Sequence, residues 1–64
     1  MDIILNGEAR QTAATTLADL LTEQGFTARV ATARNGDFVP AGLRAATPIN
    51  RGDRIEVLSA MQGG

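Results

Sequence analysis

The 64-residue sequence contains no cysteine, no histidine and no lysine. Without cysteine the chain can form neither a disulfide nor a thiolate metal site, and without histidine it lacks the commonest zinc ligand and general base. We therefore expect no metal centre, no cofactor held by the chain and no enzyme activity of its own. Stability has to come from apolar packing, because a domain this small buries only about 60% of its unfolded surface.

Charge and aromatic residues are also sparse. Six arginines, spread along the chain, are outnumbered by seven acidic residues, and Phe26 and Phe38 are the only aromatic residues. Nucleic-acid binding needs a basic surface and aromatic stacking platforms, so nucleic acid is not an expected partner. The sequence shows no signal peptide and no apolar run approaching about 18 residues, which predicts a cytoplasmic protein with no membrane partner.

A β-hairpin is predicted at the start of the chain. Residues 2–5 form a short apolar run that ends at Asn6-Gly7. Both residues of this dipeptide tolerate positive φ, which a two-residue hairpin turn requires. Residues 8–12 then form the predicted return strand.

One helix of about nine residues should follow the hairpin. Thr16 is placed to cap its first turn, Asp19 lies where the helix dipole favours a negative charge, and Gly25 supplies the stop, with Phe26 as the apolar contact behind it. The residues expected to pack this helix into the core repeat at helical spacing and are Leu17, Leu20 and Leu21.

The second half of the sequence predicts three more strands. Residues 30–33 and 37–39 flank a second Asn-Gly turn at residues 35 and 36. Residues 41–49 lack a clear period and fit a connection with one turn of 3₁₀ helix. The last strand-like run begins at Arg54 and extends toward Met61, with residues 54–59 as its body.

Alternation along the last strand gives its two faces different roles. Ile55 and Val57 should face the helix, which leaves Arg54, Glu56 and Leu58 on the opposite face. We expect Leu58 to belong to an apolar docking patch there. The predicted fold class is α+β: a mixed sheet with one helix across it and the C-terminal strand placed centrally beside the first strand.

The final Gly63-Gly64 dipeptide is the most unusual chemical feature. Glycine has no Cβ, so two in succession give a thin, flexible terminus able to enter a narrow channel. We expect residues 1–60 to form the domain and residues 61–64 to form the tail. Because the chain has no cysteine, any sulfur that it carries cannot be a side-chain persulfide, and the C-terminal carboxylate is the available position.

Several segments in this order resemble the ThiS family of bacterial sulfur carriers. They are Ile-Leu-Asn-Gly-Glu at 4–8, Thr-Leu-Ala-Asp-Leu-Leu at 16–21, Asn-Gly-Asp-Phe-Val-Pro at 35–40, Gly-Asp-Arg-Ile-Glu-Val-Leu at 52–58 and the terminal Gly-Gly. The resemblance covers the whole chain and implies the ubiquitin-like β-grasp fold and a role in making the thiazole half of thiamin.

The resemblance also implies the chemistry and the partners. A ThiF-type activating enzyme would use ATP to adenylate the Gly64 carboxylate. Sulfur from a sulfurtransferase or a cysteine desulfurase would then convert it to a thiocarboxylate, the donor for thiazole synthase. Gly63 would give access to the active site of the partner, and Leu58, Met61 and Gln62 would contribute to partner binding.

Three alternatives remain open at this stage. The small subunit of molybdopterin synthase shares the fold and the Gly-Gly thiocarboxylate. A ubiquitin-like modifier or interaction module would use the same tail for isopeptide bonds. An enzyme is the least expected, because Asp19 and Glu23 fit a solvated helix face better than an acid–base pair.

Overall fold

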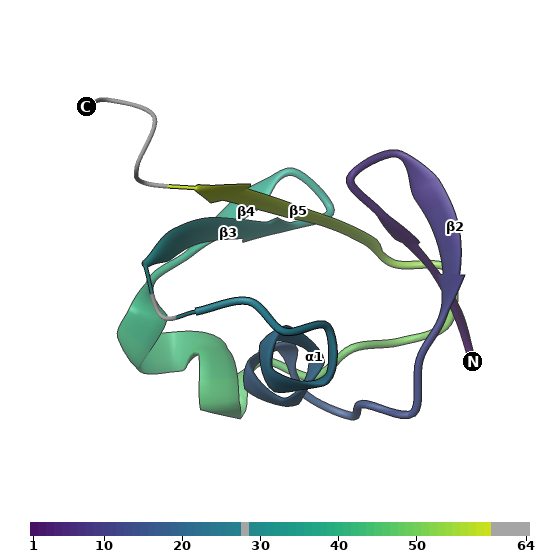
Figure 1. The fold of residues 1–64 in the computed structure, drawn as a ribbon, viewed down its shortest axis with the longest axis horizontal. Helices are drawn as coiled ribbons and strands as arrows, with labels where there is room; N and C mark the ends of the chain where they lie inside the picture. Colours follow the sequence, from purple (N-terminus) through teal and green to yellow (C-terminus); the bar gives the residue numbers. More distant parts are fainter. Residues whose placement is uncertain (28, 60–64) are drawn as a thin grey trace.

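Five strands form one mixed sheet, and one α-helix crosses beneath it (Figure 1). The computed structural model describes residues 1–27 and 29–59. The strands are β1 (Asp2–Leu5), β2 (Glu8–Gln11), β3 (Val30–Arg34), β4 (Asp37–Val39) and β5 (Arg54–Ser59). The helix is α1 (Leu17–Glu23), and a 3₁₀ helix, η1 (Ala41–Ala46), precedes β5. The α+β prediction is therefore confirmed.

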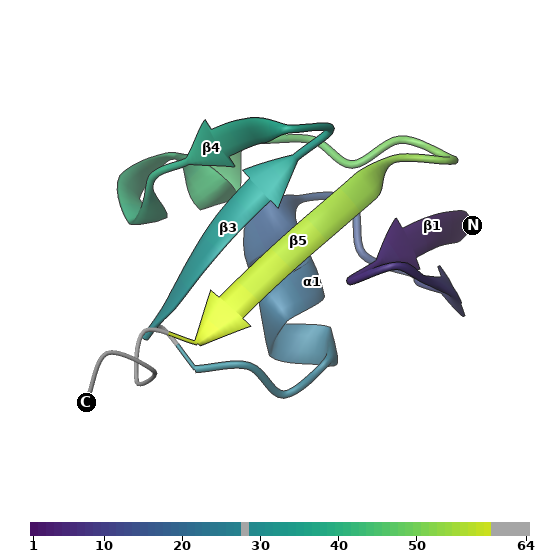
Figure 2. The same ribbon diagram turned by 90° about the horizontal axis from the view of Figure 1, so that it is seen from above.

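The strand β5 lies in the middle of the sheet, whose order is β2-β1-β5-β3-β4 (Figure 2). It runs parallel to β1, with Leu5 opposite Ile55, and antiparallel to β3, with Thr32 opposite Val57. The first strand and the last described strand are thus direct neighbours, as predicted. A strand hydrogen-bonded on both sides is fixed more firmly than an edge strand.

Both Asn-Gly dipeptides form the predicted hairpin turns. Asn6 and Gly7 have φ values of 51° and 81° between β1 and β2. Asn35 and Gly36 have φ values of 51° and 88° between β3 and β4. Positive φ at both central positions matches the right-handed twist of the flanking strands.

The caps of α1 are those predicted, although the helix is shorter. Thr16 Oγ1 accepts a hydrogen bond from the Asp19 N–H at 3.2 Å. At the other end Gly25 has φ 79°, and the Phe26 N–H donates to the Leu21 carbonyl at 2.9 Å. The helix has 7 residues and not about nine, because Gln24 has already left helical geometry as the C-cap, with ψ 0°.

The 3₁₀ helix η1 is longer than the single turn predicted, with 6 residues. Pro40, at φ −62°, starts it, and its carbonyl accepts from the Leu43 N–H at 2.9 Å. Its only buried residue is Arg44. A helix that buries an arginine has no apolar repeat, which is why the sequence pattern does not reveal its length.

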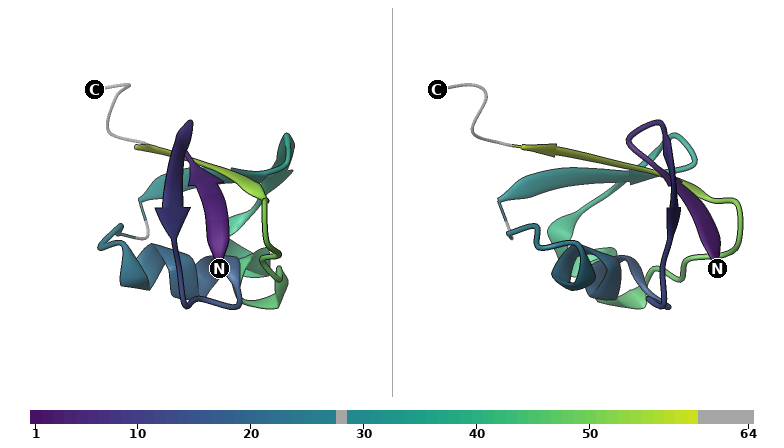
Figure 3. Two further views of the ribbon diagram at one scale, coloured as in Figure 1. Left: turned by 90° about the vertical axis from the view of Figure 1, so that its right-hand side faces the viewer. Right: turned by 45° about the vertical axis from the view of Figure 1, so that its right-hand side comes forward.

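The core lies between the sheet and the layer formed by α1 and η1 (Figure 3). Its largest fully buried side chains come from both layers. Those that are less than 2% exposed are Ile3, Leu17, Leu20, Thr32 and Ile55. The leucine stripe of α1 packs into this core as predicted. Only one face of the sheet is covered by helices in the described part of the chain, and the other face is open.

Candidate functional site

The open face of the sheet carries the exposed side chains of β5. Ile55 and Val57 are buried in the core, whereas Arg54, Glu56 and Leu58 are exposed. Leu58 is 67% exposed, one residue before the last described residue, Ser59. The structure therefore places Leu58 on the face that strand alternation predicts.

Leu58 belongs to a small apolar patch that spans three strands. Across the sheet it faces Ala31 of β3, and Ala33 of the same strand faces Phe38 of β4. Phe38 is 69% exposed. We call Ala31, Ala33, Phe38 and Leu58 the open-face patch.

A hollow of about 140 Å³ lies within this patch. The patch residues line it together with Thr32 and Glu56. Its alanines are short while Phe38 and Leu58 are long, so the two long side chains can stand on either side of a lower floor. A shallow apolar hollow with one carboxylate at its rim is suited to an apolar side chain of a protein partner.

The strand β5 is held in place by side chains as well as by the sheet ladder. Asn6 Oδ1 accepts from the Val57 N–H at 2.8 Å, and Asn6 Nδ2 donates to the Val57 carbonyl at 3.2 Å. On the other side, Asn35 Oδ1 accepts from the Arg54 N–H at 2.8 Å. Each hairpin turn thus contributes an asparagine that pairs with β5 as a neighbouring strand would.

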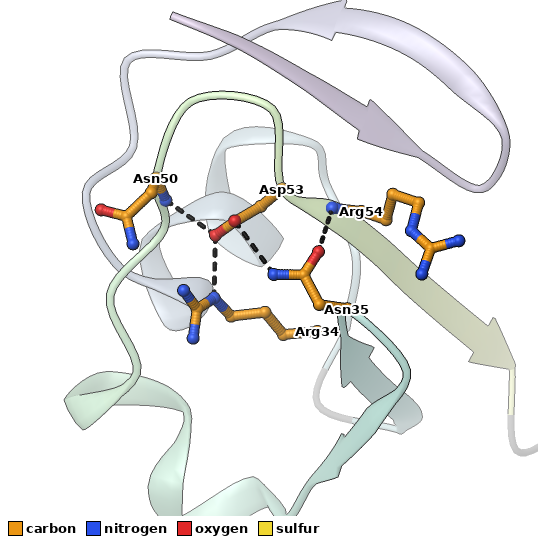
Figure 4. A network of polar contacts seen from close by, with 5 residues as sticks. All are labelled: Arg34, Asn35, Asn50, Asp53 and Arg54. Carbon is orange, nitrogen blue, oxygen red and sulfur yellow. Dashed lines mark hydrogen bonds and ion pairs between the residues drawn. The ribbon is translucent and has the colours of Figure 1, made fainter.

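Asp53 is the centre of a second set of bonds at the start of β5 (Figure 4). Its Oδ2 accepts from Arg34 Nε and from the Asn50 N–H, both at 2.8 Å, and its Oδ1 accepts from Asn35 Nδ2 at 3.0 Å. The residue is only 8% exposed. Burial alone would raise the pKa of Asp53, but the bonds from Asn50, Arg34 and Asn35, with the charge of Arg34, together lower it.

Glu23 joins the end of α1 to the loop that precedes the helix. Its carboxylate accepts from the Thr12 hydroxyl and from the Ala13 N–H, the latter at 3.0 Å. These bonds, led by that from Thr12, lower the pKa of Glu23. Asp19 lies exposed in the first turn of the helix, at its capped end. The Glu23 carboxylate therefore has a structural role in tying the loop to the helix.

The described residues offer no grouping for a metal. Residues 1–27 and 29–59 contain no cluster of three or more His, Cys, Asp or Glu side chains that could hold an ion. Within the same residues no helix is both long and apolar enough to cross a membrane. The remaining predicted site residues, Met61, Gln62, Gly63 and Gly64, lie outside the described part of the chain.

Residues 3–64 match the ThiS family. The chain belongs to the ThiS family. The match extends over the strands, the helix and the terminal Gly-Gly, so it covers the open-face patch and all residues predicted to act at the tail.

Two relatives of this ThiS-family chain are informative. A thiazole synthase of Paramagnetospirillum magneticum is 38% identical over 66 residues, which cover 100% of this chain and 20% of that protein. The chain thus spans about a fifth of the length of this curated relative. The crystal structure of the thiamine biosynthesis protein ThiS from Geobacter metallireducens superposes with a TM-score of 0.87, at 25% identity and with 100% of both chains covered. The ubiquitin-like β-grasp fold is confirmed.

Sequence reasoning about this ThiS-family member missed three residues that shape the site. Phe38 adjoins Val39, which is buried, so strand alternation would have placed it on the open face. The sequence predicts only turn positions for Asn6 and Asn35. Their side-chain bonds to β5 depend on strands far apart in the sequence, and no local pattern reveals them.

Proposed function

We propose that this protein is a sulfur carrier in thiamin thiazole biosynthesis, and that it acts as a carrier and not as an enzyme. The observation that carries the proposal is membership of the ThiS family over residues 3–64, which includes both terminal glycines. The fold match to a thiamine biosynthesis protein supports it. We place the carrier in the cytoplasm, where its partners would act.

The reactive group in this proposal is the carboxylate of Gly64. A ThiF-type enzyme binds ATP, and a Gly64 oxygen attacks the α-phosphorus, releasing pyrophosphate and leaving an acyl adenylate. A persulfide on a sulfurtransferase or a cysteine desulfurase then attacks the acyl carbon and displaces AMP, which leaves an acyl disulfide. A thiol reductant cleaves its S–S bond, so that the thiocarboxylate is released and the thiol is oxidised to a disulfide. The resulting thiocarboxylate is ionised at neutral pH and needs no general base, which suits a chain without histidine.

We propose that the partners grip the open-face patch and the segment that follows it. Leu58 anchors the docking, while Met61, Gln62 and Gly63 lead to the reactive end. Residues 60–64 are five residues, so the Gly64 carboxylate can lie at most about 18 Å from the end of β5. An active site within that distance of the docked sheet would be reached while the domain stays folded.

The named relative supports thiazole synthase as the sulfur acceptor. A protein called thiazole synthase contains, within one polypeptide, a segment like the whole of this chain. Joining two functions in one polypeptide keeps them at a high effective concentration. We infer that the present chain meets a thiazole synthase as a partner, with residues 1–60 as the domain and residues 61–64 as the tail.

Intact mass spectrometry tests the proposal. The purified chain is incubated with ATP, a ThiF-type enzyme, a thiol reductant and a cysteine desulfurase with cysteine. We expect a product heavier by the difference between sulfur and oxygen, located on Gly64 by fragmentation. The proposal requires Gly64 to be the free C-terminus, which the starting mass checks. Failure of the chain to gain sulfur, while an established ThiS protein does so with the same enzymes, would contradict the proposal.

A further inference from the structure

A groove lies between α1 and η1, on the helical side of the molecule and away from the open-face patch. Figures 1 and 3 show the two helices side by side beneath the sheet, and they are in contact. The groove has a volume of about 320 Å³, at the lower end of the range for small-ligand pockets. Its lining residues are Ala18, Leu21, Thr22, Phe26, Thr27, Ala41, Arg44 and Ala45.

Among the residues that the structure describes, Arg44 is the only charged one that lines this groove, and it is only 7% exposed. Its Nε donates to Thr32 Oγ1 at 3.1 Å, and one Nη donates to the Val30 carbonyl. Both acceptors are neutral groups of β3. The arginine thus joins η1 to the sheet, but no acidic group of the described residues pairs with its charge.

The absence of a counter-ion is unusual for a buried arginine. Buried charges are normally paired, because removing an ion from water costs several kcal/mol. Arg34, the partly buried arginine of β3, follows this rule by pairing with Asp53 at 2.8 Å. Among the described residues, ion pairs join only Arg34 to Asp53 and Arg10 to Glu8, so Arg44 has none.

Part of the Arg44 guanidinium is free to bind a ligand. Arginine has five N–H donors, and two of them are used in the bonds to β3. Within residues 1–27 and 29–59, no hydrogen bond involves Nη1. No buried side-chain nitrogen there lacks a partner, so Nη1 must be accessible from outside. Arg44 is one of the residues that line the groove, and this accessible nitrogen is the donor left there for a ligand.

From these observations we propose that the groove between α1 and η1 is a binding site for a small carboxylate ligand. The guanidinium supplies the positive charge and hydrogen-bond donors that match a carboxylate. The alanines, Leu21 and Phe26 of the lining give space for a short apolar body attached to it. This site is separate from the proposed sulfur-carrier chemistry, and neither depends on the other.

Titration of the ¹⁵N-labelled chain with sodium isobutyrate, followed by NMR, tests the proposal. Isobutyrate has one carboxylate and a small branched apolar body. We expect saturable shifts of the Arg44 Nε–H signal and of the Ala18 and Ala45 amides, with half-saturation on the order of 10 mM or below. Sodium chloride at the same ionic strength should not reproduce them. Inorganic phosphate is the third arm, and tighter binding of phosphate than of isobutyrate would overturn the carboxylate assignment.

Variants separate the site from general charge effects. Arg44→Met should weaken isobutyrate binding by about tenfold or more, as expected for loss of a charge-assisted contact. Arg51→Met changes the net charge equally at an exposed turn residue, and it should bind as the parent does. Unchanged binding in a folded Arg44→Met would overturn the proposal.

A second variant covers the case in which Arg44→Met fails to fold through loss of its bonds to β3. Ala45→Phe places a large side chain at an exposed lining position and leaves Arg44 and its acceptors in place. We expect Ala45→Phe to keep the parent's melting temperature and to lose the saturable shifts. A folded Ala45→Phe that binds isobutyrate as the parent does would rule out the groove.

Discussion

Asn6 binds both backbone polar groups of Val57, a residue 51 positions later in the sequence. The Asn6 amide thereby continues the pairing of β1 with β5 beyond Leu5 and Ile55. Its backbone N–H also donates to the Ile55 carbonyl at 2.9 Å. One turn residue therefore fixes the strand that carries Leu58 and leads to the tail.

We predict that Asn6→Ala lowers the free energy of unfolding by about 2–4 kcal/mol. The change removes two hydrogen bonds and leaves a Cβ-bearing residue at φ 51° without the local bonds that asparagine uses there. Asn6→Gly is the matched control, because glycine tolerates this φ and loses only the bonds. In urea unfolding, stability should decrease from the parent to Asn6→Gly and further to Asn6→Ala. Equal stability of all three would contradict a stabilising role for the Asn6 side chain.

Asp53 should make stability depend on pH in the acid range. Its pKa is lowered in the folded state, so it stabilises the fold above its unfolded pKa of about 3.9, and this contribution is lost as pH falls through the lower folded value. Asp53→Asn should lower the free energy of unfolding by about 2 kcal/mol at neutral pH and flatten its decline below about pH 5.

Glu23 also has a lowered pKa, so its contribution to stability is likewise lost as the pH falls. The variant Glu23→Gln removes that contribution and separates it from the contribution of Asp53. Urea midpoints measured across this range check the prediction. A decline as steep in Asp53→Asn as in the parent would show that Asp53 does not contribute.

Leu58→Arg should weaken binding of the activating enzyme by about 2 kcal/mol, the size typical of an interface anchor, and leave the fold intact. The reason is that the Leu58 side chain is 67% exposed and lines the hollow in the open-face patch. Leu43→Arg makes the same change at a side chain of η1 that is 55% exposed and should bind normally. Ile55→Arg should unfold the domain, because Ile55 is buried. Calorimetry measures the binding of the variants, and thermal melts measure their folding. Equal binding by Leu58→Arg and Leu43→Arg would exclude the open-face patch as the docking surface.

Deletion of Gly64 should abolish adenylation and leave the melting temperature unchanged. The proposed reactive carboxylate would then sit on Gly63, one residue short of its position in the partner. Pyrophosphate exchange into ATP with a ThiF-type enzyme measures the first effect, and circular dichroism measures the second. Pyrophosphate exchange at the parental rate would contradict the assignment of the reactive carboxylate to Gly64.

The thiocarboxylated chain should donate sulfur to thiazole synthase and not to the large subunit of molybdopterin synthase. Both acceptors would meet the same Gly-Gly thiocarboxylate, so discrimination has to come from the open-face patch and from residues 58–62. A single-turnover comparison with one preparation tests this. Turnover with the large subunit of molybdopterin synthase and none with thiazole synthase would contradict the role in thiamin biosynthesis. The proposal that the chain carries sulfur as a thiocarboxylate would still stand.

Local patterns in the sequence account for most of the fold. Asn-Gly dipeptides, the Thr16 cap and Gly25 have conformational preferences of their own, and the alternation of Ile55, Val57 and Leu58 reflects burial on one face. The extent of η1 could not be predicted, because its buried residue is Arg44, which gives no apolar repeat and whose bonds go to a strand that is distant in sequence. The same holds for Asp53, whose turn position is visible in the sequence but whose partner Arg34 is not.

The central position of β5 has a mechanical consequence. Its parallel neighbour is β1, so force that pulls the last strand along its axis away from the first strand loads the bonds between them in shear. The bonds from Ile4 to Asp53 and from Asn6 to Ile55 and Val57 would then have to break together and not one after another. We therefore expect the sheet to resist unfolding when a partner pulls on the C-terminal end of the chain.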